Sequence, residues 1–397
     1  MTAAPGRPAV LHAVRAYLPV TENWIHEQLR QLQGYSPVVV CDVPERPEAF
    51  PVAALHVLEP APAWRTWVNR LHRRLWHANW PGTYEAVLQA CRPALVHAHF
   101  GDRGVLMLAT AMRHGLPLVT TFYGYDVSKL PREPKWRPRL ARLFASGDRF
   151  LVEGPHMRDA LVTLGCPPEK VFVHHLGLDP TRYPYRVRRP GPGPVRLLVA
   201  GSFREKKGLA YALEAFGRVA ARRPGQVALT VIGDGPLREA LVGIPRAHGV
   251  EPWVRWLGYQ PHAVFLAEAL AAHVLLAPSV VASDGDTEGG APVTLLEAQA
   301  TGLPVLATWH ADVPEVTRPG ASAWLVPERS VEALEERLEW LLANPGAWAE
   351  MGRAGRAHVE AAFDSRRLGR ALETHYDEVL AARARPQPKG RSYPSKS

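Results

Sequence analysis

The sequence predicts an α/β protein made of two Rossmann-like, doubly wound domains that face each other across a cleft. The chain has 397 residues, which is more than a single hydrophobic core usually contains. Short apolar runs alternate with amphipathic helical patterns in both halves, as is typical of parallel sheets covered by helices on both faces. A run of proline and glycine at residues 188–194 interrupts both patterns and predicts a linker near the middle of the chain.

The first half contains short apolar runs that predict strands at residues 9–14, 38–41, 95–98, 118–122, 150–152 and 171–174. Helical patterns lie between them at residues 22–32, 105–114 and 157–164. Because strands that alternate with helices usually pair in parallel, we expect residues 1–189 to form the first domain.

The second half alternates more regularly. Strands are predicted at residues 195–200, 227–232, 254–257, 274–277, 305–307 and 323–326, with helices at 210–221, 237–248, 263–271, 294–301 and 331–342. We expect residues 190–367 to form the second domain, with its ligand at the carboxyl ends of the strands. A last helical pattern lies within residues 368–385, and residues 386–397, rich in Pro, Lys and Ser, are expected to be disordered.

The composition favours a soluble globular protein, with 47% hydrophobic and 21% charged residues. No run of 18 apolar residues predicts a membrane span, and the first eight residues lack the apolar core of a signal peptide. Cys41, Cys91 and Cys166 lie far apart, form no metal-binding pattern and are typical of a protein in the reducing cytoplasm.

The net charge of +9 is unevenly placed. Residues 1–190 carry 24 Lys and Arg against 15 Asp and Glu, whereas the remaining residues carry 23 of each. A basic half can attract anionic lipid, nucleic acid or a phosphorylated acceptor, or it can serve solubility alone.

Residues 64–76 combine arginines with apolar side chains at helical spacing. One face is expected to hold Trp64, Trp67, Val68, Leu71 and Leu75. A basic helix with tryptophan can lie on an anionic membrane. The alternative is a helix that packs on its own domain through the apolar face and leaves the charges in solvent.

The most informative run is residues 287–305, where Glu288 precedes Gly289 and Gly290, and Glu297 follows on a predicted helix. A helix start offers free backbone N–H groups and the positive end of the helix dipole, so it attracts phosphate. Glycines let a ligand approach the backbone, and carboxylates accept hydrogen bonds from hydroxyls. The combination is suited to a nucleotide sugar, which has phosphates in the middle and a sugar at each end.

Other strand ends in the second half carry residues of similar chemistry. Residues 201–208 join a strand to a helix and place small and cationic side chains where a diphosphate would lie, although the same pattern also describes a charged helix start on the surface. The candidate positions are Gly201, Ser202, Arg204, Lys207, Asp234, Gly258 and Tyr259. For Tyr259, a packed aromatic at a plain turn is an equal alternative.

In the first half, residues 119–128 run from a strand into the turn Tyr123–Gly124, with Asp126 just beyond. We expect Asp126 in the cleft, and a helix cap is the alternative. His97 and His99 lie two residues apart on a strand and point to the same side, where they could hold a metal. We expect no metal there, because no third ligand lies nearby in the sequence, and we expect His99 to face the cleft.

Together these motifs resemble the GT4-type retaining glycosyltransferases, which have the GT-B fold. The family signature has two glutamates separated by seven residues and then Ala-x-x-x-Gly-x-Pro-Val; here eight residues separate Glu288 from Glu297. Residues 201–208 and 121–126 resemble the family's Gly-Arg-x-x-x-x-Lys-Gly and Thr-x-His-Gly-x-Asp elements, with Ser202 in place of arginine and Tyr123 in place of histidine. Residues 15–25 stand where the family has its acceptor-facing loop.

The resemblance implies a role for each candidate. Lys207 would contact the donor diphosphate, Glu297 the ribose hydroxyls and Glu288 the transferred sugar, with Lys207, Glu288 and Asp126 as the catalytic group. The backbone around Val293, Thr294 and Leu295 would hold the leaving phosphate. The acceptor side of the cleft would include His99, Tyr123, Gly124, Thr21 and Trp24.

The implied activity is retaining transfer of a hexose from a nucleotide-diphosphate sugar to a hydroxyl of a glycan or glycolipid, in polysaccharide or glycolipid biosynthesis. The resemblance implies no cofactor, no metal and no nucleic-acid partner. It also implies a final helix that crosses back onto the first domain, and a cytoplasmic location that can extend to the inner face of the membrane. The alternatives are a GT-B sugar phosphorylase, a nucleotide-sugar epimerase, and a non-catalytic glycan-binding or membrane-surface protein.

Overall fold

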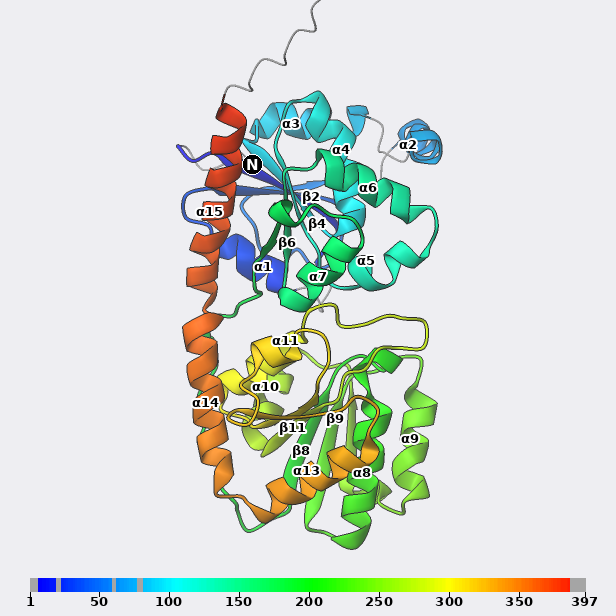
Figure 1. Cartoon of the computed structure of the whole chain (residues 1–397), viewed down its shortest axis with the longest axis vertical. Coiled ribbons are helices and arrows are strands. Elements are labelled where there is room, and N and C mark those ends of the chain that lie inside the picture. The colour runs from blue at the N-terminus through cyan, green and yellow to red at the C-terminus, as the bar shows by residue number, and fades with distance from the viewer. Residues whose placement is uncertain (1–5, 19–22, 59–61, 77–80, 386–397) are drawn as a thin grey trace, which may run out of the picture.

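The computed structural model describes residues 6–18, 23–58, 62–76 and 81–385. Two α/β domains stand end to end, and the last two helices run along one side of both (Figure 1). The predicted fold class is confirmed, because each domain is built on a parallel sheet flanked by helices. The terminal residues 386–397, expected to be disordered, lie outside the described residues.

The sheet of the first domain has the strand order β3-β2-β1-β4-β5-β6-β7, and all neighbouring strands pair in parallel. The order reverses between β1 and β4, so this pair forms a topological switch point, where ligands of such sheets usually bind. The strands are β1 Ala9–Tyr17, β2 Ser36–Pro44, β3 Leu55–Val57, β4 Leu95–His99, β5 Leu118–Thr121, β6 Arg149–Val152 and β7 Val171–Val173. The helices are α1 Asn23–Arg30, α2 Ala63–Trp76, α3 Glu85–Cys91, α4 Gly101–Arg113, α5 Tyr125–Ser128, α6 Trp136–Ser146 and α7 Pro155–Thr163.

The sheet of the second domain has the order β10-β9-β8-β11-β12-β13, again parallel, with its switch point between β8 and β11. The strands are β8 Val195–Ala200, β9 Val227–Ile232, β10 Val254–Gly258, β11 Val274–Ala277, β12 Val305–Thr308 and β13 Ala323–Val326. The helices are α8 Leu209–Arg222, α9 Arg238–Ala247, α10 His262–Ala271, α11 Val293–Ala300, α12 Val313–Val316 and α13 Val331–Ala343. The central strands are short and apolar because helices cover them on both faces.

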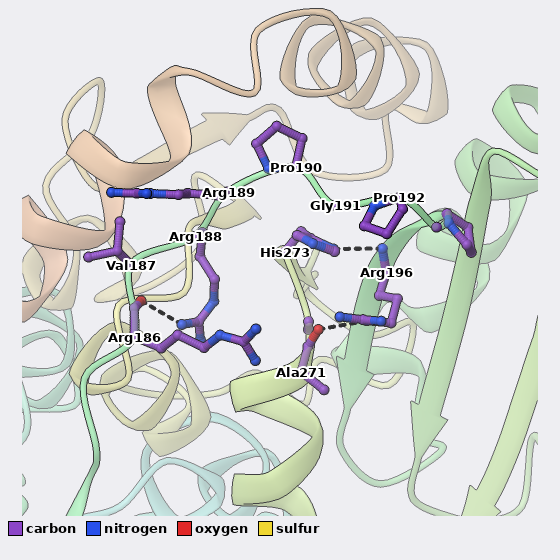
Figure 2. Close-up of a pocket in the computed structure, with 13 residues that line it drawn as sticks. Arg186, Val187, Arg188, Arg189, Pro190, Gly191, Pro192, Arg196, Ala271 and His273 are labelled. Carbon is purple, nitrogen blue, oxygen red and sulfur yellow. Dashed lines mark hydrogen bonds between the residues drawn. The ribbon is translucent and has the colours of Figure 1, made fainter.

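The linker is anchored to the second domain by Arg188, which is only 2% exposed. Its guanidinium donates to the carbonyl oxygens of Ala269 and Thr301, near the ends of α10 and α11. Helix C-termini carry partial negative charge, so they stabilise a cation without a carboxylate partner. Burial, together with the charge of Arg186, lowers the pKa of Arg188 to about 10. Figure 2 shows Arg188 among the residues that line a pocket beside the linker, together with Ala271 and His273.

The last two helices join the domains. Helix α14 (Ala347–Ala362) packs on the second domain, and α15 (Ser365–Ala384) packs on the first. The Glu373 carboxylate accepts the backbone N–H groups of Gln33 and Gly34 at 2.5 and 2.6 Å, and Tyr376 is fully buried. These contacts tie the carboxyl end of the chain to the region between α1 and β2.

Several elements were not predicted from the sequence, among them β3, α3, α6 and α14. Strand β3 has three half-exposed residues at a sheet edge, which do not form an apolar run. Helix α14 buries only three side chains larger than glycine, those of Trp348, Met351 and Val359. None of these differences alters the sheet order around the switch points. No helix in the described part of the chain is long and apolar enough to cross a bilayer.

Candidate active site

The second domain brings Lys207 and Glu288 into direct contact. Lys207 ends the short 3-10 helix Glu205–Lys207 that follows β8, and Glu288 lies in the loop before α11. The Lys207 Nζ lies 2.8 Å from Glu288 Oε2, and the Ser279 hydroxyl donates to Glu288 Oε1 at 2.9 Å. Gly201 lies beside this pair, because a Cβ on it would be 3.5 Å from Lys207 Cδ. The carboxyl ends of β8 and β11 therefore hold a cation and an acid at the switch point of the sheet.

The two lysines in this turn determine the ionisation of Glu288. The Glu288 side chain is 6% exposed, and burial acts to raise its pKa, but the ammonium groups of Lys207 and Lys206 outweigh burial and lower it. Lys206 Nζ lies 3.2 Å from Asp286 Oδ1 and donates to the carbonyl oxygen of Thr287 at 3.0 Å. Two lysines therefore face the loop before α11, and Glu288 is ionised at neutral pH.

The lysine turn depends on close backbone packing at Gly208. This residue has a φ of +64°, and a Cβ there would lie 1.8 Å from the carbonyl oxygen of Pro278. No other residue can occupy the position without moving β11 away from the turn. The glycine thus sets the distance between the Lys207 turn and the loop that carries Glu288.

Helix α11 begins at Val293, with Pro292 at the N-cap and no side-chain cap among the described residues. The backbone N–H of Leu295 is donated to the carbonyl oxygen of Pro292 at 3.0 Å, so the predicted use of Leu295 to hold a phosphate is not available in this arrangement. The N–H groups of Val293 and Thr294 belong to the first turn, which has no intrahelical acceptors. They are the donors that an anion at this helix start would meet.

Glu297 lies on the same helix and is 5% exposed. Its Oε1 accepts hydrogen bonds from the Tyr183 hydroxyl at 3.0 Å and lies 2.8 Å from His262 Nε2. The hydrogen bond to Glu297 raises the pKa of His262, and burial only partly opposes it. Neither partner was predicted from the sequence, because Tyr183 and His262 lie 114 and 35 positions before Glu297 and meet it only in the folded chain.

The remaining second-domain candidates differ in what their side chains do. The Asp234 carboxylate accepts the N–H of Gly235 at 2.8 Å and pairs with Arg238 at 3.1 Å, so it stabilises its own turn. Tyr259 follows β10, is 64% exposed and is free to meet a ligand, with Gly258 before it in the left-handed region. Ser202 is half-buried and Arg204 is exposed at the Lys207 turn.

In the first domain, Asp126 is fully buried. One carboxylate oxygen accepts the N–H groups of Tyr123 and Gly124, at 3.0 and 2.9 Å, and the other accepts the N–H of Gly101 at 2.8 Å. Burial raises the pKa of Asp126 to about 7, although these N–H groups act to lower it. The carboxylate thus points at backbone of its own domain, which supports the capping alternative: Asp126 shapes the Tyr123–Gly124 turn.

His99 was expected to face the cleft, but its side chain has no exposed surface. It is fully buried beneath Tyr123, whose hydroxyl lies 2.7 Å from His99 Nδ1, and burial lowers the pKa of His99 to about 3. Tyr123 covers it with a parallel ring at 5.9 Å and also packs against Trp24 at 6.0 Å. Tyr123 is itself buried, at 8% exposure, and Trp24 is half-buried, while Thr21 lies outside the described residues.

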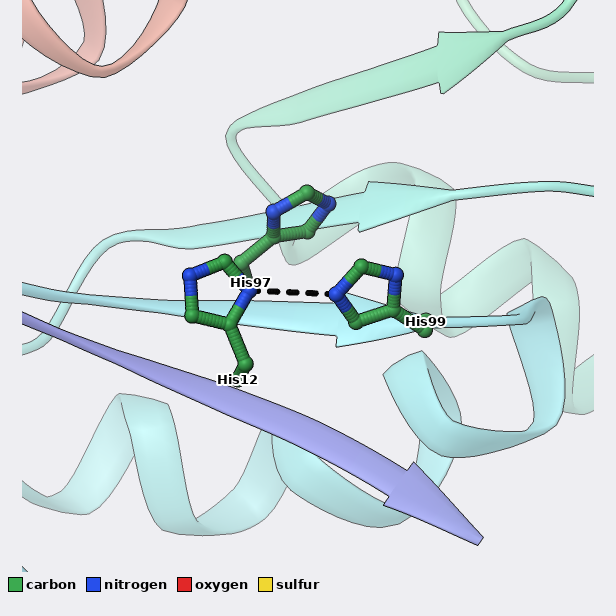
Figure 3. A group of neighbouring side chains, drawn as sticks. All are labelled: His12, His97 and His99. Carbon is green, nitrogen blue, oxygen red and sulfur yellow. Dashed lines mark hydrogen bonds between the residues drawn. The ribbon is translucent and has the colours of Figure 1, made fainter. Parts of the chain in front are cut away.

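The structure supplies the third histidine that the sequence argument lacked. His12 on β1 lies beside His97 and His99, and ligand atoms of the three lie within 4.8 Å of one another (Figure 3). His12 Nδ1 lies 3.1 Å from His99 Nε2, whereas both nitrogens of His97 are bonded at 2.7 Å, to Tyr376 and Thr121. The rings of His97 and His99 stack at 4.4 Å. The three histidines and the hydroxyl groups of Tyr123, Tyr376 and Thr121 therefore form a buried hydrogen-bond network.

The two domains meet directly at the site. A Cβ on Gly124 would lie 2.4 Å from the carbonyl oxygen of Glu288, and a Cβ on Gly289 would lie 2.1 Å from the Cα of Gly124. Lys129 and Asp284 form an ion pair across the domains at 2.6 Å. The turn that Asp126 shapes therefore packs, backbone to backbone, on the loop that carries Glu288.

Asp312 makes a second contact between the domains. From the second domain it accepts the N–H groups of His156 and Met157, at 2.8 and 3.3 Å, and so caps the start of α7 in the first. Nearby, a Cβ on Gly290 would lie 2.1 Å from Glu153 Oε2. Burial, followed by the charges of Asp312 and Asp126, raises the pKa of Glu153 well above its ordinary value. Both acids lacked a sequence signal, because neither belongs to a recognisable motif.

Comparison with known families matches both halves of the chain. Residues 22–182 match the family described as Glycosyltransferase Family 4, and residues 194–344 match the family described as Glycosyl transferases group 1. The two matches meet near the linker, so each covers one structural domain.

The chain is similar to curated glycosyltransferases of bacteria. It is 33% identical over 283 residues to the amylovoran biosynthesis glycosyltransferase AmsK of Erwinia amylovora, covering 69% of each chain. It is 36% identical over 246 residues to a Salmonella typhimurium protein named for colanic acid biosynthesis, WcaL, covering 61% of this chain and 59% of that protein. The match thus spans less than two thirds of WcaL.

Solved structures share the fold. HepE from Anabaena, in complex with UDP-glucose, has a TM-score of 0.75 at 15% identity and covers 93% of this chain and 99% of its own. The lipopolysaccharide outer core galactosyltransferase WaaB has a TM-score of 0.70 at 14% identity, with coverage of 94% and 99%. At this level of identity the likeness concerns the fold alone.

Proposed function

The chain belongs to the glycosyltransferases of Family 4 and group 1, and on that premise we propose that it moves a hexose from a nucleotide-diphosphate sugar to a hydroxyl of a glycan or glycolipid, with retention at the anomeric carbon. Polysaccharide biosynthesis is the pathway class in the names of its relatives AmsK and WcaL. We place the reaction on the cytoplasmic side, where nucleotide sugars are available as donors.

The observation that carries the proposal is the Lys207–Glu288 contact at the switch point of the second sheet. A diphosphate at this point would meet an ammonium group and the helix N–H groups of Val293 and Thr294. Without a ligand, the only counter-charge in contact with Lys207 among the described residues is Glu288. Donor binding would then replace the Glu288 carboxylate by the donor diphosphate as the anion that contacts Lys207.

This exchange gives Glu288 a role in positioning the sugar. When the diphosphate takes Lys207, Glu288 Oε2 loses its partner while Ser279 keeps Oε1 in place. The freed oxygen can accept a hydrogen bond from a hydroxyl of the transferred hexose. A partner switch of this kind orients the anomeric carbon only after the diphosphate is seated.

Retention of configuration then follows from attack on the same face as the leaving group. The acceptor oxygen forms its bond to the anomeric carbon as the bond to the diphosphate breaks, and the acceptor proton passes to the departing phosphate oxygen. Lys207 and the N–H groups at the start of α11 stabilise the charge that grows on that oxygen, so the scheme requires no metal ion. Contact between the two domains at Gly124 and Gly289 would exclude water during the step.

The donor end is tested by thermal unfolding with UDP-, GDP- and ADP-sugars. A donor that binds only the folded protein raises its melting temperature, and the rise grows with the ratio of donor concentration to the dissociation constant. We expect one base to protect the wild type, and Glu297→Ala and Lys207→Ala each to lose protection while far-UV circular dichroism is unchanged. Equal thermal protection of the wild type and both variants, or equal turnover in a transfer assay, would contradict the assigned donor site.

A further inference from the structure

A pocket beside the linker lies at the amino ends of the strands of the second sheet. It is lined by linker residues 186–194, by Arg196 in β8, and by residues 271–273, which lead into β11 (Figure 2). The carboxyl ends of the same two strands hold the Lys207–Glu288 contact, so the pocket and the candidate active site lie at opposite edges of the sheet. The pocket has a volume of about 560 Å³, within the range of small-molecule sites. We call it the linker pocket, and it shares no residue with the candidate active site.

The linker pocket is lined by four arginines, and none of its described lining residues is acidic. Their hydrogen bonds go to neutral oxygen atoms. Arg186 donates to the carbonyl oxygen of Leu270 at 3.0 Å, and Arg196 Nε donates to that of Ala271 at 2.7 Å. Arg188 also donates only to carbonyl and hydroxyl oxygens. Because cations that gather without a counter-charge repel one another, the pocket favours an anion.

The imidazole of His273 responds to this positive potential. Burial lowers the pKa of His273 to about 4, and the charges of Arg196, Arg188 and Arg186 act in the same direction. Its Nδ1 accepts the backbone N–H of Arg196 at 2.9 Å, so the neutral ring carries its proton on Nε2. His273 therefore adds a neutral donor, and no negative charge, to the arginines of the pocket.

Two of the guanidinium groups are available to a ligand, because Arg189 and Arg196 are exposed. In the part of the chain that the structure describes, Arg189 makes no side-chain hydrogen bond and Arg196 uses only its Nε. A guanidinium presents paired N–H groups that match two oxygens of a phosphate. Pro190, Pro192 and Pro194 add apolar surface without N–H groups, which suits the carbon skeleton of a phosphorylated sugar or nucleoside.

We propose that the linker pocket binds a small molecule that carries a phosphate or diphosphate group. Arg189 from the linker and Arg196 from β8 hold the phosphate oxygens, and the buried Arg188 adds its charge. The bound anion joins the linker to the second domain and stabilises the folded chain. The proposal does not rest on the transfer reaction, because the pocket contains no residue of the donor site.

Titration calorimetry on the full-length protein tests the proposal with inorganic pyrophosphate and ribose 5-phosphate, at about 0.15 M ionic strength. Sulfate is the comparison anion. We expect the phosphate compounds to bind more tightly than sulfate and to raise the melting temperature. Arg189→Gln with Arg196→Gln should weaken their binding at least about tenfold, because each substitution removes a charge-assisted contact. Arg189→Gln alone should weaken it about threefold, and it keeps the test decisive if the double variant is unstable.

A matched control removes the same charge elsewhere on the second domain. Arg246→Gln on α9 with Arg353→Gln on α14 alters two side chains that are each 67% exposed, and it should bind like the wild type. Pyrophosphate can also meet Lys207, so Lys207→Ala is titrated as well, and binding at the linker pocket should persist in it. The Arg189 and Arg196 variants should keep the nucleotide-sugar protection of the wild type, which separates the two sites.

The proposal is overturned if neither phosphate compound binds the wild type, or if sulfate binds as tightly as both of them. It is also overturned if the Arg189 and Arg196 double variant binds them like the wild type. Loss of all binding in Lys207→Ala would overturn it too, because the phosphate would then occupy the donor site.

Discussion

Replacing Lys207 by alanine tests the central contact of the site. The substitution leaves Glu288, with a side chain only 6% exposed, without its ammonium partner 2.8 Å away. Removing one member of a buried ion pair typically lowers the free energy of unfolding by about 3–5 kcal/mol. Since Ser279 and the nearby Lys206 still favour the carboxylate, we expect the lower end, about 3 kcal/mol.

The same contact predicts opposite effects on nucleotide binding for its two partners. A charge-assisted hydrogen bond contributes about 1.5–3 kcal/mol, so Lys207→Ala should weaken UDP binding by about 10- to 150-fold, if UDP is the base that the thermal screen selects. Glu288→Gln removes the carboxylate that competes with the diphosphate for Lys207. It should therefore tighten binding of the nucleotide by about fivefold or more, while turnover of the sugar donor falls.

Urea unfolding and titration calorimetry measure both quantities on the same samples. The lowered pKa of Glu288 means that the stabilising contribution of the pair is present above the unfolded value of about 4.3 and is lost as pH falls through the lower folded value. The difference between wild type and Lys207→Ala should accordingly shrink in acid. Lys129→Ala, which breaks an exposed ion pair with Asp284, is the control and should have a much smaller effect.

The double variant Lys207→Ala with Glu288→Gln completes a thermodynamic cycle with the two single variants. Because it leaves no buried charge unpaired, it should be more stable than Lys207→Ala by at least about 1 kcal/mol. Additive losses of stability, or a Glu288→Gln variant that binds nucleotide more weakly than the wild type, would refute the idea that Glu288 occupies Lys207 in place of the donor.

Three other substitutions examine the contacts around the pair. Gly124→Ala places a methyl group 2.4 Å from the Glu288 carbonyl oxygen at a φ of +125°, so initial-rate assays should show a loss of kcat/KM of about tenfold or more. Asp312→Ala removes the cap on α7 and should lower the free energy of unfolding, measured in urea, by about 0.5–2 kcal/mol and enlarge the radius of gyration in solution scattering. His262→Gln should lower the melting temperature most in mild acid: the raised pKa of His262 gives stability that is full below about pH 6.5 and is lost as pH rises through the folded pKa.

Each of these has a clear contrary result. Wild-type rates in Gly124→Ala would mean that the two domains separate at this point during turnover. An unchanged radius of gyration in Asp312→Ala would show that the α7 cap does not hold the domains together. A loss of stability in His262→Gln that grows with rising pH would contradict the charged pairing with Glu297.

Much of the architecture was predictable because short-range sequence patterns determine the helices, strands and turns. Strands β8 and β9 have the predicted bounds, since their apolar runs are short and end at glycine turns. The resemblance to Family 4 was confirmed by the comparisons with known proteins. The same local patterns predicted the helix at residues 64–76, which the structure places at Ala63–Trp76.

The orientation of the apolar side of this helix was not predictable. Periodicity shows that Trp64, Trp67 and Leu71 share a side, but whether the domain covers that side depends on where Thr83 and Gly82 lie in space. The structure places these partners against the polar side. The structure leaves Trp64 and Trp67 58% and 63% exposed, which the sequence pattern alone did not decide.

Asp126 and the histidines show the same limit inside the first domain. A motif identifies Asp126 as a candidate, but only the folded turn reveals that its oxygens accept three backbone N–H groups. His12 is separated from His99 by 87 positions, so no spacing rule could join them. Burial then removes their charge, which the amino-acid type alone does not predict.

The amino-acid sequence was sufficient to predict two α/β domains, a linker and the residue types that bind phosphate at a helix start. These features were predictable because the periodicity of helices and strands and the chemistry of turns depend on only a few neighbouring residues. The pairing of Lys207 with Glu288 across 81 positions, the Asp312 cap and the outward tryptophans of α2 were decided by how the sheets and domains pack. Those contacts join distant parts of the chain, and the charge states that follow from them depend on burial, which exists only in the folded molecule.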